Sequence, residues 1–157
     1  ACHSKWLQDS TFKVTINTNY AADVGMIEAI PNHLIRAFIN LVDNACDAMR
    51  SKKRDLSSNP NPSDTVYIPT LTVTTQLIGE TVEIRMRDNG CGIAPHIQTR
   101  ILDPFFTTKP PGAGTGLGLS LTHDIIVKQH KGTMMINSNI GEFTEIVVTI
   151  PIAMLTK

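Results

Sequence analysis

The sequence predicts an α+β fold in which helices are layered on one face of a mixed sheet. Five segments alternate polar and apolar residues and are rich in β-branched side chains, a pattern typical of strands. Two long segments instead repeat apolar residues every three or four positions, as amphipathic helices do. These segments follow one another as β, α, β, β, α, β, β. This order contains too few β-α-β units for a doubly wound parallel sheet.

The first elements lie before residue 60. Residues 11–17 alternate as a half-buried strand does. From Pro31 the apolar spacing becomes helical, and Pro31 suits a helix start. The basic cluster at residues 50–54 suits the helix end, as solvated charge that complements the helix dipole. Residues 55–64 are rich in Ser, Asn and Pro and are predicted to form an inserted loop.

The second half supplies the other strands and a second long helix. Two β-rich runs, 66–77 and 81–87, are joined around Gly79, which predicts an antiparallel hairpin. A short helix is predicted at 96–102 and a longer one at 117–131. Two more strands are expected, at 133–137 and 143–150.

Size and charge indicate one domain spanning residues 1–157, of which 41% are apolar and 18% charged. Lys plus Arg and Asp plus Glu number 14 each, so no excess positive field is available to hold nucleic acid or an anionic membrane.

The 3 cysteines are widely spaced, which fits neither a disulfide framework nor a zinc site. With no long apolar run or signal peptide, we expect a cytoplasmic domain excised from a larger protein.

The first polar constellation is NLVDNACDA, in which Asn40, Asn44 and Asp47 share one helical face. Asparagine is a middling helix former, so two of them inside a helix call for a reason beyond propensity. An exposed polar face is one interpretation. The other is a ligand set for Mg²⁺, since amide oxygens are hard donors of the kind that this ion accepts.

Two glycine motifs follow. In DNGCGI a carboxylate at a strand end, Asp88, can accept a hydrogen bond from an adenine amino group, while Gly90 and Gly92 let the backbone approach a flat ring. A plain Asn-Gly turn is the alternative. GTGLGLS opens the second long helix, where exposed N–H groups and the helix dipole favour phosphate. A glycine-rich linker is the alternative there.

Between the glycine motifs lies DPFFTTK, followed by a stretch rich in proline and glycine. Its phenylalanines can anchor a mobile segment, and Lys109 could reach a terminal phosphate. A surface loop with a hydrophobic plug fits the same composition.

Taken in order, these segments resemble the GHKL superfamily, the ATPases grouped as gyrase, Hsp90, histidine kinase and MutL. NLVDNACDA resembles the N box, DNGCGI the first glycine box, DPFFTTK the phenylalanine box of the kinases, and GTGLGLS the second glycine box. The resemblance covers residues 32 to about 150. The short stretch between TTK and GTGLGL is similar to that of nitrogen-regulation sensor kinases, which have a short lid.

This resemblance implies a Bergerat fold, a two-layer α/β sandwich with a mostly antiparallel sheet, ATP between the helices, and a flexible lid. It assigns Asp88 to the adenine amino group, Gly92 to the flank of the ring and Thr144 to a water-mediated adenine contact. Asn40, Asn44 and Lys109 are the expected catalytic residues, with Asn44 and Asn40 at Mg²⁺. The residues expected at ATP are Asn44, Asp47, Asp88, Gly90, Gly92, Ile93, Phe106, Thr107, Thr108, Lys109, Gly114, Thr115, Gly116, Leu117, Gly118, Leu119 and Thr144.

One departure from the family concerns the local turn after His130. Lys131 stands there, where the family often has glycine. The form of this turn is therefore open.

The choice between kinase and hydrolase depends on Asn40. The hydrolase branches have a glutamate four residues before the N-box asparagine to activate water, whereas an amide cannot take a proton at neutral pH. The resemblance therefore implies phosphoryl transfer from ATP to a histidine. No histidine here fits an acceptor helix, so it is expected upstream, on a dimerisation domain, with a response-regulator receiver domain as second partner. A GHKL ATPase, an anti-sigma-type serine kinase and a degenerate scaffold are the alternatives.

Overall fold

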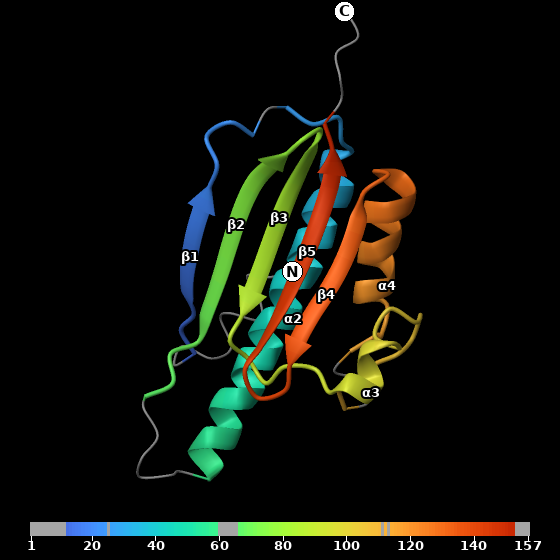
Figure 1. The fold of residues 1–157 in the computed structure, drawn as a ribbon. Helices are drawn as coiled ribbons and strands as arrows, with labels where there is room; N and C mark the ends of the chain where they lie inside the picture. The colour runs from blue at the N-terminus through green and yellow to red at the C-terminus, as the bar shows by residue number, and fades with distance from the viewer. Residues whose placement is uncertain (1–11, 25, 60–65, 111, 113, 153–157) are drawn as a thin grey trace, which may run out of the picture.

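The computed structural model describes residues 12–24, 26–59, 66–110, 112 and 114–152. Its secondary structure is ordered along the chain much as the sequence predicts (Figure 1). The elements are β1 (Thr15–Tyr20), α2 (Pro31–Ser58), β2 (Thr70–Ile78), β3 (Thr81–Asp88), α3 (Pro95–Gln98), α4 (Gly118–His123), the π-helix η1 (Asp124–Gln129), β4 (Thr133–Asn139) and β5 (Phe143–Pro151).

The strands form one mixed sheet in the order β1-β2-β3-β5-β4. β1 pairs with β2 in parallel, and the other neighbours pair antiparallel. The predicted hairpin is confirmed: Ile78 faces Thr81 across a two-residue loop, and Gly79 takes a φ of +58° there. The mixed, mostly antiparallel sheet is therefore as expected.

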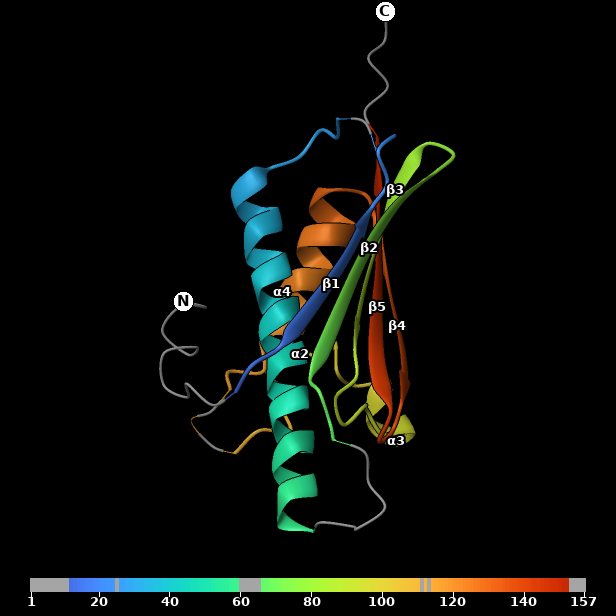
Figure 2. The same ribbon diagram turned by 90° about the vertical axis from the view of Figure 1, so that its left-hand side faces the viewer.

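Both long helical segments lie on the same face of the sheet, which Figure 2 shows edge-on. Helix α2 contributes Leu34, Ala37 and Leu41 to the main core, which η1 extends with Ile125 and Ile126. The sheet supplies the remaining buried members of this cluster, which are Met86, Ile146, Val148 and Ile150. The predicted two-layer sandwich is confirmed.

Helix α2 is longer than predicted. It begins at Pro31, as expected, but continues to Ser58, so the prediction of a loop from residue 55 is wrong for 55–58. Cys46 and Met49 pack with Phe12 in a second core cluster, which lies before this added turn. The Ser58 hydroxyl bonds back to the Arg54 carbonyl within the last turn. The remainder of the predicted loop, residues 60–65, lies outside the described residues.

The first strand begins later than the alternation indicated. β1 starts at Thr15 and all six of its residues are exposed, so the half-buried strand at 11–17 is wrong in position. The apolar residues Phe12 and Val14 pack into the second core cluster before the strand begins. They produced the alternation without belonging to the strand. Thr11 lies outside the described residues.

The two predicted helices of the second half differ from regular α-helices. α3 is only four residues long, and turns occupy 99–105. The helix predicted at 117–131 is α-helical only to His123 and then widens into η1. Buried His130 ends η1: its Nδ1 lies 2.8 Å from the Ile125 carbonyl, and its Nε2 accepts from the Ile30 amide at 3.0 Å. The histidine thereby ties the end of η1 to the start of α2.

In the part of the chain that the structure describes, no helix has both the length and the apolar character needed to cross a bilayer.

The turn after His130 forms despite the missing glycine, with Lys131 at a φ of +55°. Because a side chain disfavours this left-handed conformation, we expect Lys131→Gly to raise the free energy of unfolding by up to about 1 kcal/mol, measured by urea denaturation. Lys131→Ala is the control, since it keeps a β-carbon at the same φ and loses the bond from Lys131 Nζ to the Lys128 carbonyl. A gain of equal size in both variants would contradict a backbone origin.

Candidate functional site

A cleft of about 900 Å³ opens between α2, the end of β3, the 91–116 region and the start of α4. Every residue that the sequence placed at ATP lines this cleft except Gly90 and Leu117. Asn40 also lines it. The four motifs, spread over residues 40–120 of the sequence, therefore share one cavity.

Asp88 is the last residue of β3 and is only 5% exposed. Burial raises the pKa of its carboxyl to about 6, while hydrogen bonds from the backbone of Gly90 and Thr144 and the charge of Lys52 act to lower it. The Gly90 amide donates to Asp88 Oδ1 at 2.8 Å. Gly90 thus does not line the cleft, and its role is to hold the carboxylate of Asp88 through its backbone N–H. A largely ionised carboxylate at neutral pH is consequently held in an apolar wall.

The loop after Asp88 is held against the β4–β5 turn. The Gly141 amide donates to the Cys91 carbonyl at 2.7 Å, and a β-carbon on Gly92, at a φ of +67°, would collide with the Asn139 backbone. Only glycine fits that approach. Thr144 lies opposite Asp88 in the β3–β5 pairing, so both reach the same end of the cleft.

Thr144 is further fixed by a hydroxyl network. Ser138 Oγ lies 3.0 Å from Thr144 Oγ1, and it also accepts from the Ile93 amide at 2.8 Å. The network joins β4, β5 and the loop after β3. Ser138 was missed from the sequence, where a lone serine in a strand carries no signal.

The polar stripe of α2 faces the cleft, so the exposed-face interpretation is wrong. Asn40 Nδ2 points to α4, lying 3.4 Å from the Gly118 carbonyl and 3.5 Å from Thr122 Oγ1. This orientation leaves its amide oxygen as the atom able to accept a hydrogen bond from a ligand or to bind a metal ion. Asn44 and Asp47 instead face Lys109, the last residue of the phenylalanine box.

Lys109 reaches across the cleft to α2. Its ammonium lies 2.5 Å from Asp47 Oδ2 and 3.5 Å from Asn44 Oδ1. Arg50 also donates to Asp47, at 3.2 Å. Cationic groups therefore already gather around the carboxylate and amide oxygens of this stripe.

The second glycine motif closes the cleft at the start of α4. Gly116 has a φ of +67°, and a β-carbon there would collide with the backbone of Phe105, itself at a φ of +67°. The backbones of Phe105 and Gly116, both in the left-handed region, thus lie in contact. This contact explains why residue 116 is a glycine. Phe105 is 74% exposed, whereas Phe106 lines the cleft beside the Arg100 guanidinium.

The donor set fits a magnesium ion that shares its shell with a ligand. No group of three or more His, Cys, Asp or Glu in the described ranges could hold a metal by protein side chains alone. Asn44 and its neighbours offer hard oxygen donors at the place where Lys109 is attracted. Mg²⁺ commonly combines one or two protein oxygens with substrate phosphates, which suits this arrangement.

The sequence interpretation missed two basic residues in the cleft. Arg50 and Arg54 line it, although the basic cluster at 50–54 was interpreted as solvated charge at a helix end. The cluster does not lie at the helix end, because α2 continues to Ser58, although Arg54 is exposed as a solvated charge would be. The spacing of both arginines from Asp47, three and seven positions on, continues the polar stripe and could have revealed them.

A family model and curated relatives both place this chain in the same family. Residues 29–154 match the family described as Histidine kinase-, DNA gyrase B-, and HSP90-like ATPase. The chain is 30% identical over 145 residues to Sporulation kinase E of Bacillus subtilis (strain 168), covering 92% of this chain and 17% of that protein. It is 32% identical over 131 residues to the sensor histidine kinase ZraS of Escherichia coli (strain K12), covering 83% and 24%. The chain thus spans less than a quarter of these relatives.

Solved structures share the fold. The nucleotide-free catalytic domain of histidine kinase ThkA has a TM-score of 0.69 at 23% identity, covering 95% of this chain and 85% of that one. Full-length ShkA in complex with AMPPNP also has a TM-score of 0.69, at 20% identity, covering 92% of this chain and 27% of that one.

The buried carboxylate predicts an effect on stability. Because the pKa of Asp88 is about 6 in the folded state and near 3.8 otherwise, the penalty for its charge is absent below pH 3.8, grows up to pH 6 and is complete above. We expect Asp88→Asn to raise the free energy of unfolding at pH 7.5 by about 1–3 kcal/mol, less near pH 4. Urea denaturation at both pH values measures this difference.

The control for this stability prediction is Asp23→Asn, which removes the same charge from an exposed position. Its effect should stay within about 0.5 kcal/mol at either pH. A loss of stability in Asp88→Asn at pH 7.5 would contradict the conclusion that burial of the charged carboxylate destabilises the folded state.

Proposed function

Because this chain belongs to the histidine kinase-, DNA gyrase B- and HSP90-like ATPases, a family that binds ATP, we propose that it is the catalytic domain of a sensor histidine kinase. In this proposal residues 1–157 are one domain that binds Mg²⁺-ATP and transfers the γ-phosphoryl group to a histidine on a separate dimerisation domain. One observation supports it above the others. The buried carboxylate of Asp88 lies along the same cleft as three cationic side chains, those of Arg50, Arg54 and Lys109.

At the adenine end, Asp88 accepts a hydrogen bond from the exocyclic amino group. A charge-assisted bond in a buried position is stronger and more selective than one in water. Thr144 holds a water between Asp88 and the ring, and Gly92 and Ile93 flank the ring. The apolar wall behind it includes Met86, Ile136 and Ile146.

At the phosphate end, the backbone amides of residues 116–119 bind the phosphate oxygens, together with the polar groups of Thr107, Thr108 and Thr115. Lys109 leaves Asp47 for the terminal phosphate. Arg50 lies close enough to keep Asp47 paired when this happens. Mg²⁺, when bound by Asn44 and Asn40 with the phosphates, supplies charge neutralisation at the transferred group.

The transfer step needs positioning more than a strong base. An imidazole nitrogen of the acceptor forms a bond to the γ-phosphorus, the bond to the β–γ bridging oxygen breaks, and ADP leaves. The imidazole proton passes to solvent. Asn40 acts through its amide oxygen, because its nitrogen is directed to α4. This oxygen either completes the Mg²⁺ site or orients the incoming ring.

The larger protein is also a proposal. Its relatives include proteins named as sensor histidine kinases and as a two-component sensor. By analogy, the partners of this chain are a dimerisation domain that carries the acceptor histidine and the receiver domain of a response regulator. A position on the cytoplasmic side, where ATP is present, follows from the same analogy, and the parent protein could be anchored in a membrane.

Reconstitution tests the proposed transfer. The domain is mixed with a purified dimerisation domain from a sensor kinase related to this one and with labelled ATP, and acid-labile, base-stable phosphate on histidine is measured. We expect transfer with the wild type and none with Asp88→Asn, whose ADP affinity should also fall below detection in calorimetry. Base-labile phosphate on a serine would instead favour the anti-sigma-type kinase, and nucleotide binding without any transfer would favour a scaffold.

Asn40 separates transfer from hydrolysis. The isolated domain should hydrolyse ATP very slowly, and Asn40→Glu should increase steady-state phosphate release by about tenfold or more, because a positioned general base contributes about 10²–10⁴-fold. Asn40→Gln is the matched control, since it retains the amide donor toward the Gly118 carbonyl without supplying a base. Brisk wild-type hydrolysis that disappears in Asn44→Ala would contradict the kinase and favour the ATPase.

A further inference from the structure

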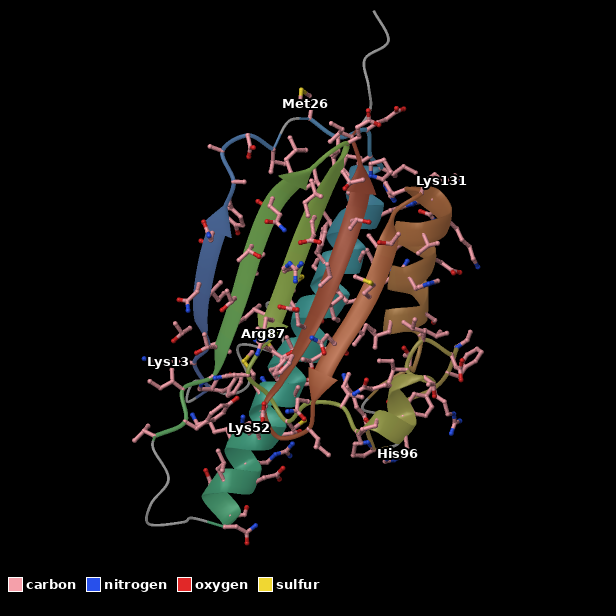
Figure 3. All side chains as sticks on the ribbon, in the orientation of Figure 1. Lys13, Met26, Lys52, Arg87, His96 and Lys131 are labelled. Atoms are coloured by element: carbon pink, nitrogen blue, oxygen red, sulfur yellow. The ribbon has the colours of Figure 1, made fainter. Side chains whose placement is uncertain are left out.

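Lys52 lies on α2 between Arg50 and Arg54, in the part of the helix beside the loop that follows β3 (Figure 3). The residues that line the cleft in the described ranges include Ser51 but not Lys52. Lys52 Nζ instead donates to the Asn89 carbonyl at 2.9 Å. It therefore acts behind the loop that begins at Asp88.

Asn89, between Asp88 and Gly90, is held at each of its polar groups. Its backbone N–H donates to the Thr70 carbonyl at 3.2 Å, and its side-chain Oδ1 accepts from the Thr70 backbone N–H at 2.8 Å. Its Nδ2 donates to the Ile68 carbonyl at 2.9 Å. The side chain thus continues the β2–β3 ladder by one step, which fixes the backbone directly after Asp88.

Tyr67 completes this arrangement. Its hydroxyl lies 3.1 Å from both the carbonyl and Oδ1 of Asn89, and the Lys52 ammonium lies 5.1 Å from the centre of its ring. Burial, followed by the negative charge of Asp88, raises the pKa of the Tyr67 phenol well above its usual range. Tyr67 is therefore a neutral donor at this site. Lys52 is left as the cation beside the loop.

We propose that Lys52 is a positioning residue for adenine recognition, which fixes the Asn89 carbonyl next to Asp88 and places a positive charge behind the loop that carries this carboxylate. This inference rests on the proposed function of Asp88 as the adenine acceptor. It adds a residue that touches neither the nucleotide nor the cleft.

The charges around Asp88 support this role. Among the groups that shift the pKa of Asp88, Lys52 is the charged side chain, and it lowers that pKa against the raising effect of burial. The other titratable neighbours are Tyr67 and Cys91; burial first, then Asp88, raises the pKa of each, so both stay neutral. The charge of Asp55 acts to raise the pKa of Cys91 and is negative, so Asp55 cannot replace Lys52.

The test is the pH dependence of ADP affinity between pH 5.5 and 8.5, measured by calorimetry. In the wild type, affinity should fall as the pH drops through about 6, because the adenine amino group needs the ionised form of Asp88. Lys52→Gln keeps a hydrogen-bond donor but removes the charge, which raises the pKa of Asp88. The midpoint should then move up by about half to one pH unit, with a roughly two- to fivefold loss at pH 6 and little loss at pH 8.5.

Three further measurements separate charge from shape. Lys52→Arg should restore the wild-type midpoint, and Lys53→Gln, which removes a charge from the side of α2 facing Phe12, should leave it in place. The carboxyl carbon of Asp88, followed by NMR in the ligand-free protein, should titrate at a higher pH in Lys52→Gln. This reading depends on neither ADP nor activity.

The outcomes distinguish the two proposals. If the wild type binds ADP but Lys52→Gln has the wild-type midpoint, or a loss of equal size at every pH, the role of Lys52 is overturned and the proposed function stands. If the wild type does not bind ADP at all, the proposed function fails first. An upward shift in Lys52→Gln that Lys52→Arg reverses supports the inference.

Discussion

Helix α2 packs one face against the sheet, where Ala37, Leu41 and Met49 are 0–2% exposed. The neighbouring face is thereby held in one rotation, which directs Asn40, Asn44 and Asp47 into the cleft. A rotation of the helix by a single residue would bury these polar groups and expose the core. Hydrophobic burial thus positions the polar stripe. The core packing of α2 and the orientation of its polar side chains therefore cannot vary independently.

Much of this arrangement follows from sequence alone, because periodicity and glycine spacing are local properties. The strands from β2 onward, the start of α2 at Pro31 and the residues of the four motifs could all be identified in that way. Packing between distant segments explains the misplaced first strand, because Phe12 and Val14 imitate a strand while they pack in the second core cluster. The extension of α2 to Ser58 lies beyond that cluster and carries a local contact instead, the bond from the Ser58 hydroxyl to the Arg54 carbonyl.

The role of Lys52 could not be predicted from the sequence for the same reason as the first strand. It belongs to a basic cluster whose charge could be explained locally, as complementing the dipole of the helix. Its partner, the Asn89 carbonyl, becomes evident only when α2 is placed beside β3. Arg50 differs, because its partner Asp47 lies three residues earlier on the same helix.

The parallel pairing of β1 determines where the chain enters the domain. Thr15 pairs with Thr70, next to the pair of Leu71 and Asp88, so β1 begins at the sheet end that carries the cleft. Phe12, just before it, lies 4.7 Å below the Arg50 guanidinium, which in turn holds Asp47. Phe12, Arg50, Asp47 and Lys109 therefore form a continuous chain of side-chain contacts, which joins the residues just before β1 to the end of the phenylalanine box across the mouth of the cleft.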